Sequence, residues 1–77
     1  MKMENLGLQS AHEHFLTLMK NAPSHDLLDQ CRQQALGFLQ GLHIADFLDE
    51  EYYGGLRDEV QCTFLYASES LVNKAVA

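Results

Sequence analysis

Apolar residues recur at intervals of three and four along most of the chain, as they do on one face of an α-helix. No stretch keeps the period of two that is typical of a β-strand. The spacing predicts helices over approximately residues 8–21, 24–40, 46–53 and 56–73. We therefore expect an all-α fold, a small bundle of three to four helices in a single domain over residues 1–77.

The first predicted helix has two candidate starting points. Ser10 and Glu13 have the spacing of a capping box, in which each side chain satisfies a free backbone N–H. Leu8 would extend the apolar stripe backwards, which favours a start nearer Asn5. Pro23 predicts the end, because the residue before a proline avoids the helical conformation. The stripe consists of Ala11, Phe15, Leu18, Met19 and Ala22.

The second predicted helix has a recognisable signal at each end. Ser24 is the expected N-cap, and Asp26 in the first turn suits the helix dipole. Gly41 is the expected left-handed residue that stops the helix. The short connection over 21–24 predicts that the first two helices form an antiparallel hairpin. The apolar stripe consists of Leu27, Leu28, Cys31, Ala35, Phe38, Leu39 and Leu42.

Two adjacent glycines interrupt the second half of the chain. Asp46 is expected to cap a short helix that runs to Tyr53 and meets Gly54 and Gly55. Each glycine costs a helix interior about 1 kcal/mol, so the pair favours a break between two helices over a kink in one. The long helix that follows has a stripe of Leu56, Val60, Phe64, Ala67 and Leu71.

The last predicted helix is apolar on a second side, formed by Cys62, Leu65 and Tyr66. A helix with two apolar faces must be covered on both of them. Short chains build small cores, and oligomerisation is a common remedy. We therefore predict a homodimer with Cys62, Leu65 and Tyr66 at its interface. The alternative is that the short helix over 46–53 covers this face within one monomer.

The charge balance narrows the classes of partner. Among 77 residues there are five Lys and Arg against eleven Asp and Glu, a formal net charge of −6. Direct binding to nucleic acid, or to an anionic membrane surface, needs cations that this chain lacks. The chain has no apolar run long enough to span a membrane and no secretory leader pattern, so we expect a cytoplasmic protein.

An acidic segment over residues 46–59 is the most distinctive local feature. It holds six carboxylates against one arginine, together with two tyrosines. Carboxylates interleaved with tyrosines suit docking onto a basic protein surface. The alternatives are a solvated helix face and, as an extreme case, imitation of DNA phosphates. The predicted partner-binding residues are Asp49, Glu50, Glu51, Tyr52, Tyr53, Asp58 and Glu59.

Metal and cofactor sites find little support. The carboxylates lack the alternating ligands and the glycine of a calcium loop. His12 and His14 lie about 200° apart on a helix and cannot chelate one ion, so we expect the histidines at surface or boundary positions. We predict no cofactor and no metal.

Nucleophilic catalysis finds no support either. Cys31 and Cys62 are interpreted as reduced, mostly buried thiols. Ser24, His25 and Asp26 are adjacent, whereas the members of a catalytic triad are assembled across a fold. We therefore expect a non-enzymatic interaction protein: a regulator, inhibitor or accessory subunit. The alternative function is a small-molecule or metal-binding helical protein whose pocket between helices is lined by Met19, Phe38, Phe64 and Tyr66.

Overall fold

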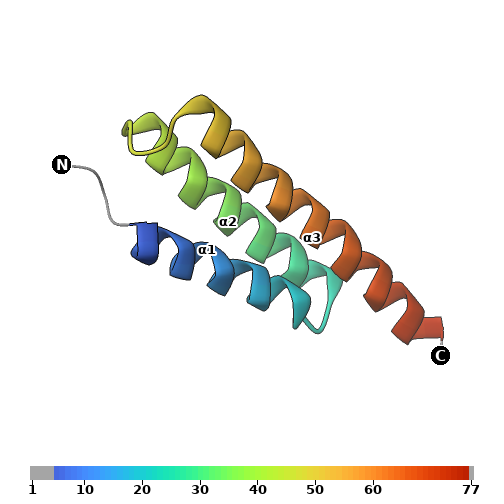
Figure 1. Ribbon diagram of the computed structural model, residues 1–77. Coiled ribbons are helices and arrows are strands. Elements are labelled where there is room, and N and C mark those ends of the chain that lie inside the picture. Colours follow the sequence, from blue (N-terminus) through green and yellow to red (C-terminus); the bar gives the residue numbers. More distant parts are fainter. Residues whose placement is uncertain (1–4, 77) are drawn as a thin grey trace.

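Three α-helices make up the architecture that the computed structural model describes over residues 5–76: α1 (Asn5–Lys20), α2 (His25–Ile44) and α3 (Glu50–Val76) (Figure 1). The described range contains no strand, and each helix packs against both others. The predicted all-α bundle is confirmed. The single domain predicted over residues 1–77 extends at both ends beyond the described range.

The start of α1 contradicts the predicted capping box. The helix begins at Asn5, so Ser10 lies inside it and caps nothing. Burial explains the earlier start, because Leu8 belongs to the apolar core and extends the helical stripe toward the N-terminus. At the other end, Ala22 is buried just beyond the helix and is followed by Pro23.

The N-terminus of α2 is capped as the sequence predicts. Ser24 has an extended backbone, and its hydroxyl oxygen accepts a hydrogen bond from the backbone N–H of Leu27 at 3.2 Å. Asp26 lies in the first turn. One turn further on, the Asp29 carboxylate accepts hydrogen bonds from Arg32 and Gln33. These local contacts stabilise the first turns of α2.

The predicted end of α2 at Gly41 is wrong. The helix continues to Ile44, and the left-handed residue that follows it is Asp46, with φ of 72°. The backbone N–H of Asp46 donates to the carbonyl of His43 at 3.1 Å, and that of Phe47 donates to Leu42 at 2.9 Å. This pair of bonds is a Schellman motif, in which aspartate replaces the usual glycine.

The predicted pair of helices over 46–53 and 56–73 is one helix, α3. Asp49, and not Asp46, caps it: the Asp49 carboxylate accepts from the backbone N–H of Tyr52 at 2.7 Å. The helix runs through Gly54 and Gly55, neither of which has a positive φ. Burial of apolar residues on both sides of the pair, including Leu56, offsets the helix-breaking tendency of two glycines.

The core lies along the line where the three helices meet, and aromatic contacts extend it. The Phe15 and Phe38 rings lie 5.5 Å apart, and the Arg32 guanidinium lies 4.7 Å from the centre of the Phe64 ring. The buried apolar residues are Leu8, Met19, Ala22, Leu28, Ala35, Leu39, Leu48, Leu56, Val60 and Ala67.

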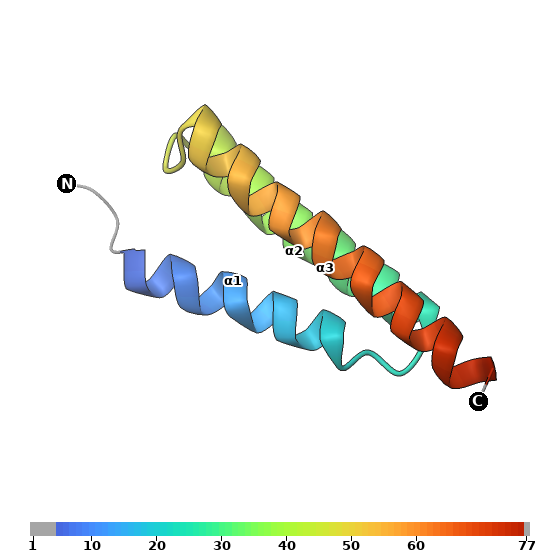
Figure 2. The ribbon, with the colours of Figure 1, turned by 45° about the vertical axis from the view of Figure 1, so that its right-hand side comes forward.

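The bundle is elongated, with extents of 50 × 19 × 16 Å. Helices α2 and α3 lie side by side over most of their length, and α1 lies beside them, inclined to both (Figures 1 and 2). The connection between α1 and α2 is short, as predicted, but α1 diverges from α2 toward its N-terminal end (Figure 2). Strict antiparallel alignment of this hairpin therefore stays a prediction. No helix over residues 5–76 is long and apolar enough to cross a membrane.

Candidate functional site

A groove runs between the N-terminal half of α1 and the N-terminal turns of α3, with a volume of about 660 Å³. Four of its lining residues carry carboxylates, and one is a tyrosine. From α1 come Gln9 and Glu13; from the cap and first turns of α3 come Asp49, Glu51, Tyr52, Gly55, Leu56 and Glu59. We call this surface the acidic groove.

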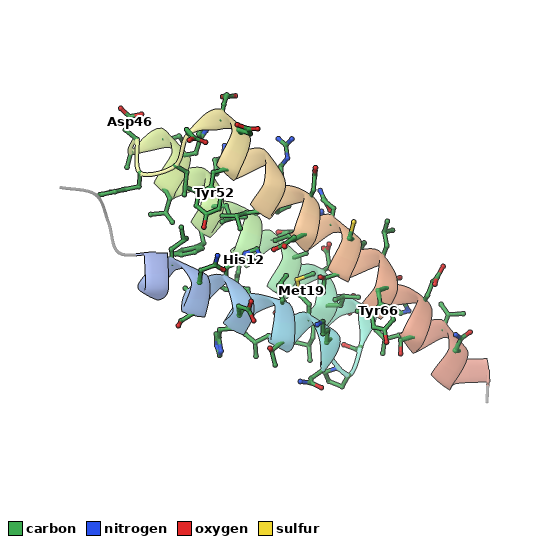
Figure 3. All side chains as sticks on the ribbon, viewed as in Figure 1. His12, Met19, Asp46, Tyr52 and Tyr66 are labelled. Atoms are coloured by element: carbon green, nitrogen blue, oxygen red, sulfur yellow. The ribbon has the colours of Figure 1, made fainter. Side chains whose placement is uncertain are left out.

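Local helix structure explains how the α3 side of the groove is built. Asp49 is held at the helix start by its capping bond to Tyr52. Residues three and four apart share a helix face, so Tyr52 and Glu59, seven residues apart, lie on the same side two turns from each other. Tyr52 points toward α1, and its hydroxyl lies 3.4 Å from the Gln9 side-chain nitrogen (Figure 3).

A buried histidine joins α1 to α3 beside the groove. His12 lies in the core with only 2% of its surface exposed, which contradicts its predicted surface or boundary position. Its Nε2 atom lies 2.6 Å from Oε1 of Glu59. A carboxylate only accepts hydrogen bonds, so Nε2–H is the donor. Glu59 itself stays 60% exposed and is one of the residues that line the groove.

The structure divides the predicted partner-binding residues into two groups. Asp49, Glu51, Tyr52 and Glu59 line the acidic groove. Glu50, Tyr53 and Asp58 do not belong to its lining. Gln9 and Glu13 complete the groove and were missed from the sequence, although their spacing of four places them on one face of α1.

Glu50 and Tyr53 belong instead to a cluster around His43. The His43 and Tyr53 rings are stacked with their centres 4.3 Å apart. Glu50 reaches the His43 Nε2 atom at 3.4 Å, and the Arg57 guanidinium lies 5.4 Å from the centre of the Tyr53 ring. These side chains join the end of α2 to the start of α3 and are already engaged within the chain.

The second apolar face of α3 is open to solvent. Leu65 is 63% exposed, Tyr66 is 66% exposed, and Cys62 is exposed beside them. The alternative covering of this face by a short helix over 46–53 is wrong, because residues 50–53 are the first turn of α3 itself. A helix does not cover its own outer side. A shallow depression at this face is lined by Lys20, Cys62, Thr63 and Tyr66.

Two further predictions are wrong: that both cysteines are mostly buried, and that four side chains line one pocket between the helices. Both cysteines are free, but Cys62 is exposed and only Cys31 is partly buried. The four residues proposed for a pocket between helices do not share one, since Met19 has no exposed surface and Tyr66 lies largely in solvent. In the described part of the chain, no three His, Cys, Asp or Glu side chains gather closely enough to hold a metal ion.

Comparison with protein-family models, with curated proteins and with solved structures found no match to this chain. Function is therefore inferred from the geometry of the acidic groove and of the exposed face of α3.

Proposed function

We propose that this protein is a non-enzymatic interaction module that binds a basic segment of a partner protein in the acidic groove. The observation that carries the proposal is the convergence of Glu13 from α1 with Asp49, Glu51 and Glu59 from the α3 end in one groove. A Lys or Arg side chain entering it meets several carboxylates and the polar edge of Tyr52.

Electrostatics favours a basic protein over nucleic acid as the occupant. The groove contains no lysine or arginine, and the whole chain carries a formal net charge of −6. Phosphates would be repelled, whereas a cationic peptide would be steered to the groove and bound in a salt-dependent way. Arginine suits the site best because its planar guanidinium binds carboxylates in a bidentate manner.

The experiment is a titration with an arginine- and lysine-rich helical peptide, followed by amide NMR shifts. We expect the shifts to concentrate at Gln9, Glu13, Tyr52 and Gly55. The Glu13→Lys/Glu51→Lys variant is expected to weaken binding at least about fivefold.

The matched control is Glu50→Lys/Asp58→Lys, which changes the net charge by the same amount on carboxylates outside the groove lining. We expect it to weaken binding by less than about twofold, through general charge alone. Equal weakening by the two variants would show non-specific attraction and would contradict the proposal.

We propose that the module acts as a homodimer through the exposed apolar face of α3. The support is the exposure of Leu65 and Tyr66, two large apolar side chains that are adjacent in the chain. Light scattering at several concentrations measures the solution mass. Leu65→Ser/Tyr66→Ser is expected to shift the dimer toward monomer, whereas Ile44→Ser/Phe47→Ser, which removes exposed apolar residues at the other end of the bundle, is not. A monomer at every concentration would contradict this part of the proposal.

The proposed compartment is the cytoplasm. It is supported by two free cysteines, one of them exposed, since such thiols persist in a reducing environment. Fluorescence of a tagged chain in cells, with a tag at either end, tests this assignment. Accumulation outside the cytoplasm with both tags would contradict it.

A further inference from the structure

The outward face of α3 carries a stripe with the spacing of a helix–helix seam. Cys62, Leu65, Glu69 and Val72 follow one another at steps of three, four and three residues, the pattern of the facing positions in a coiled coil. Leu65 and Val72 are 63% and 50% exposed, and Tyr66 flanks them. This side of α3 lies opposite the residues that it buries, Leu56, Val60 and Ala67, so neither α1 nor α2 covers it.

One acidic and one basic side chain lie in different parts of this surface. Glu69 is exposed within the stripe and borders a shallow depression with Ser68, Val72 and Asn73. Lys20, in the last turn of α1, borders the other depression with Cys62 and Tyr66. No carboxylate lies within ion-pairing distance of Lys20 among the residues that the structure describes.

The geometry points to a second copy of this chain, bound antiparallel along α3, with Glu69 of each copy facing Cys62 and Lys20 of the other. This inference rests on the proposed homodimer and assigns its geometry. Facing positions 62 and 69 place the two-fold axis between Leu65 and Tyr66. Leu65 of one copy then packs on Tyr66 of the other, which buries the most exposed leucine of the stripe and the exposed tyrosine that flanks it. The symmetry makes two Lys20–Glu69 ion pairs, one on each side of the axis.

Charge disfavours the parallel arrangement. In a parallel pair, Glu69 faces Glu69 and Asp58 faces Asp58, so like charges meet along the seam. The acidic turns at residues 49–51 would also lie side by side. The antiparallel arrangement places these turns at opposite ends of the dimer and leaves both acidic grooves open to partners. This separation lowers the repulsion between two copies that each carry a formal net charge of −6.

Disulfide trapping tests the arrangement, in a Cys31→Ser background that leaves Cys62 as the one thiol. In the antiparallel register the two Cys62 residues are offset by seven residues, about 10 Å along the helix, too far to form a disulfide. We expect no cross-linked dimer in this background. Adding Glu69→Cys places a thiol opposite Cys62 of the other copy, and we expect cross-linking to near completion under mild oxidation.

The outcomes separate this geometry from the homodimer itself. Rapid Cys62–Cys62 cross-linking would overturn the antiparallel arrangement, and so would a solution dimer that the Glu69→Cys variant fails to cross-link. A monomer at every concentration would contradict the homodimer and the geometry together. Circular dichroism of each variant checks that the helices are retained.

A charge exchange provides a second measurement. Lys20→Glu and Glu69→Lys are each expected to raise the dimer dissociation constant about fivefold or more, since each replaces two attractions by two repulsions. The double variant Lys20→Glu/Glu69→Lys restores both ion pairs with their charges exchanged. Its dimer dissociation constant is expected to lie within about twofold of that of the parent chain. A double exchange no tighter than either single variant would overturn the proposed pairing of Lys20 with Glu69.

Discussion

The Nε2 atom of His12 lies 2.6 Å from Oε1 of Glu59 and thereby ties the middle of α1 to α3. The imidazole is buried to 2% exposure, whereas the carboxylate is 60% exposed. Glu59 thus has two roles, since it satisfies a buried donor with one oxygen and contributes charge to the acidic groove. A substitution of Glu59 is therefore expected to affect both the stability of the fold and the candidate binding surface.

Removing the carboxylate is expected to destabilise the fold. Glu59→Ala leaves the His12 Nε2 atom buried without a partner, which costs about 1–3 kcal/mol of unfolding free energy. Glu59→Gln retains an acceptor for the same donor and should cost less than the alanine variant. Urea denaturation measures both. Asp58→Ala removes an exposed carboxylate one residue away and should stay within about 0.5 kcal/mol of the parent chain. If Glu59→Ala also stayed within about 0.5 kcal/mol of the parent chain, the hydrogen bond between His12 and Glu59 would add no stability.

The helical pattern predicted the fold class because three long apolar stripes leave few alternatives. It failed at His12 for a specific reason. Leu8, His12, Phe15 and Met19 share one face of α1, but a pattern of apolar residues does not identify a histidine as part of the core. Its burial depends on an acceptor supplied by α3, 47 residues away in the chain. The pattern of residues along α1 alone gives no information about an acceptor on another helix.

Replacing Gly41 by alanine is expected to stabilise the protein. Gly41 lies inside α2, its φ is not positive, and an added Cβ would meet no atom within 4 Å. Alanine is favoured over glycine in a helix interior by about 1 kcal/mol, which raises the melting temperature of a chain of this size by roughly 4–8 °C. A thermal melt measures the change. Had Gly41 been the left-handed residue that ends the helix, alanine would lower the melting temperature instead.

Replacing Asp46 by glycine is expected to stabilise the turn between α2 and α3. Asp46 has a φ of 72°, which costs an L-residue about 1 kcal/mol and costs glycine almost nothing. Denaturation midpoints of Asp46→Gly and Asp46→Val test this, since a β-branched residue should be strongly disfavoured at the same position. The order glycine, aspartate, valine in falling stability is the expected result. Equal stability of the two variants and the parent chain would contradict the left-handed turn.

The ends of the helices were the least predictable part of the fold, and glycine shows why. The intrinsic preferences of Gly41, Gly54 and Gly55 predict helix ends at these residues. In the structure, Leu39, Leu48 and Leu56 are buried around them, and this packing outweighs the local cost. The acidic groove was half predictable for a similar reason. Its α3 residues stand together in sequence, but Gln9 and Glu13 join them only because α1 packs against α3.

The two cysteines are expected to differ in reactivity. Cys62 is exposed on the outer face of α3, whereas Cys31 is partly buried on α2. A thiol-specific chromogenic reagent should modify one cysteine fast and the other slowly under native conditions, and both at one rate in denaturant. Cys62→Ser is expected to remove the fast phase, and Cys31→Ser the slow one. Fast modification in the Cys62→Ser variant would contradict the partial burial of Cys31. In the proposed homodimer, the fast phase should slow as protein concentration rises.

Asp49 allows capping and charge to be separated at one position. Its carboxylate accepts the backbone N–H of Tyr52 at the start of α3 and also lines the acidic groove. Asp49→Ala removes both features and should cost about 1 kcal/mol of stability together with affinity for the basic peptide. Asp49→Ser keeps a capping oxygen but no charge, so it should retain most of the stability while binding the peptide more weakly. Urea denaturation and the peptide titration, made on the same two variants, measure the two effects independently. If the serine variant bound the peptide as tightly as the parent chain, the charge of Asp49 would have no part in the groove's function.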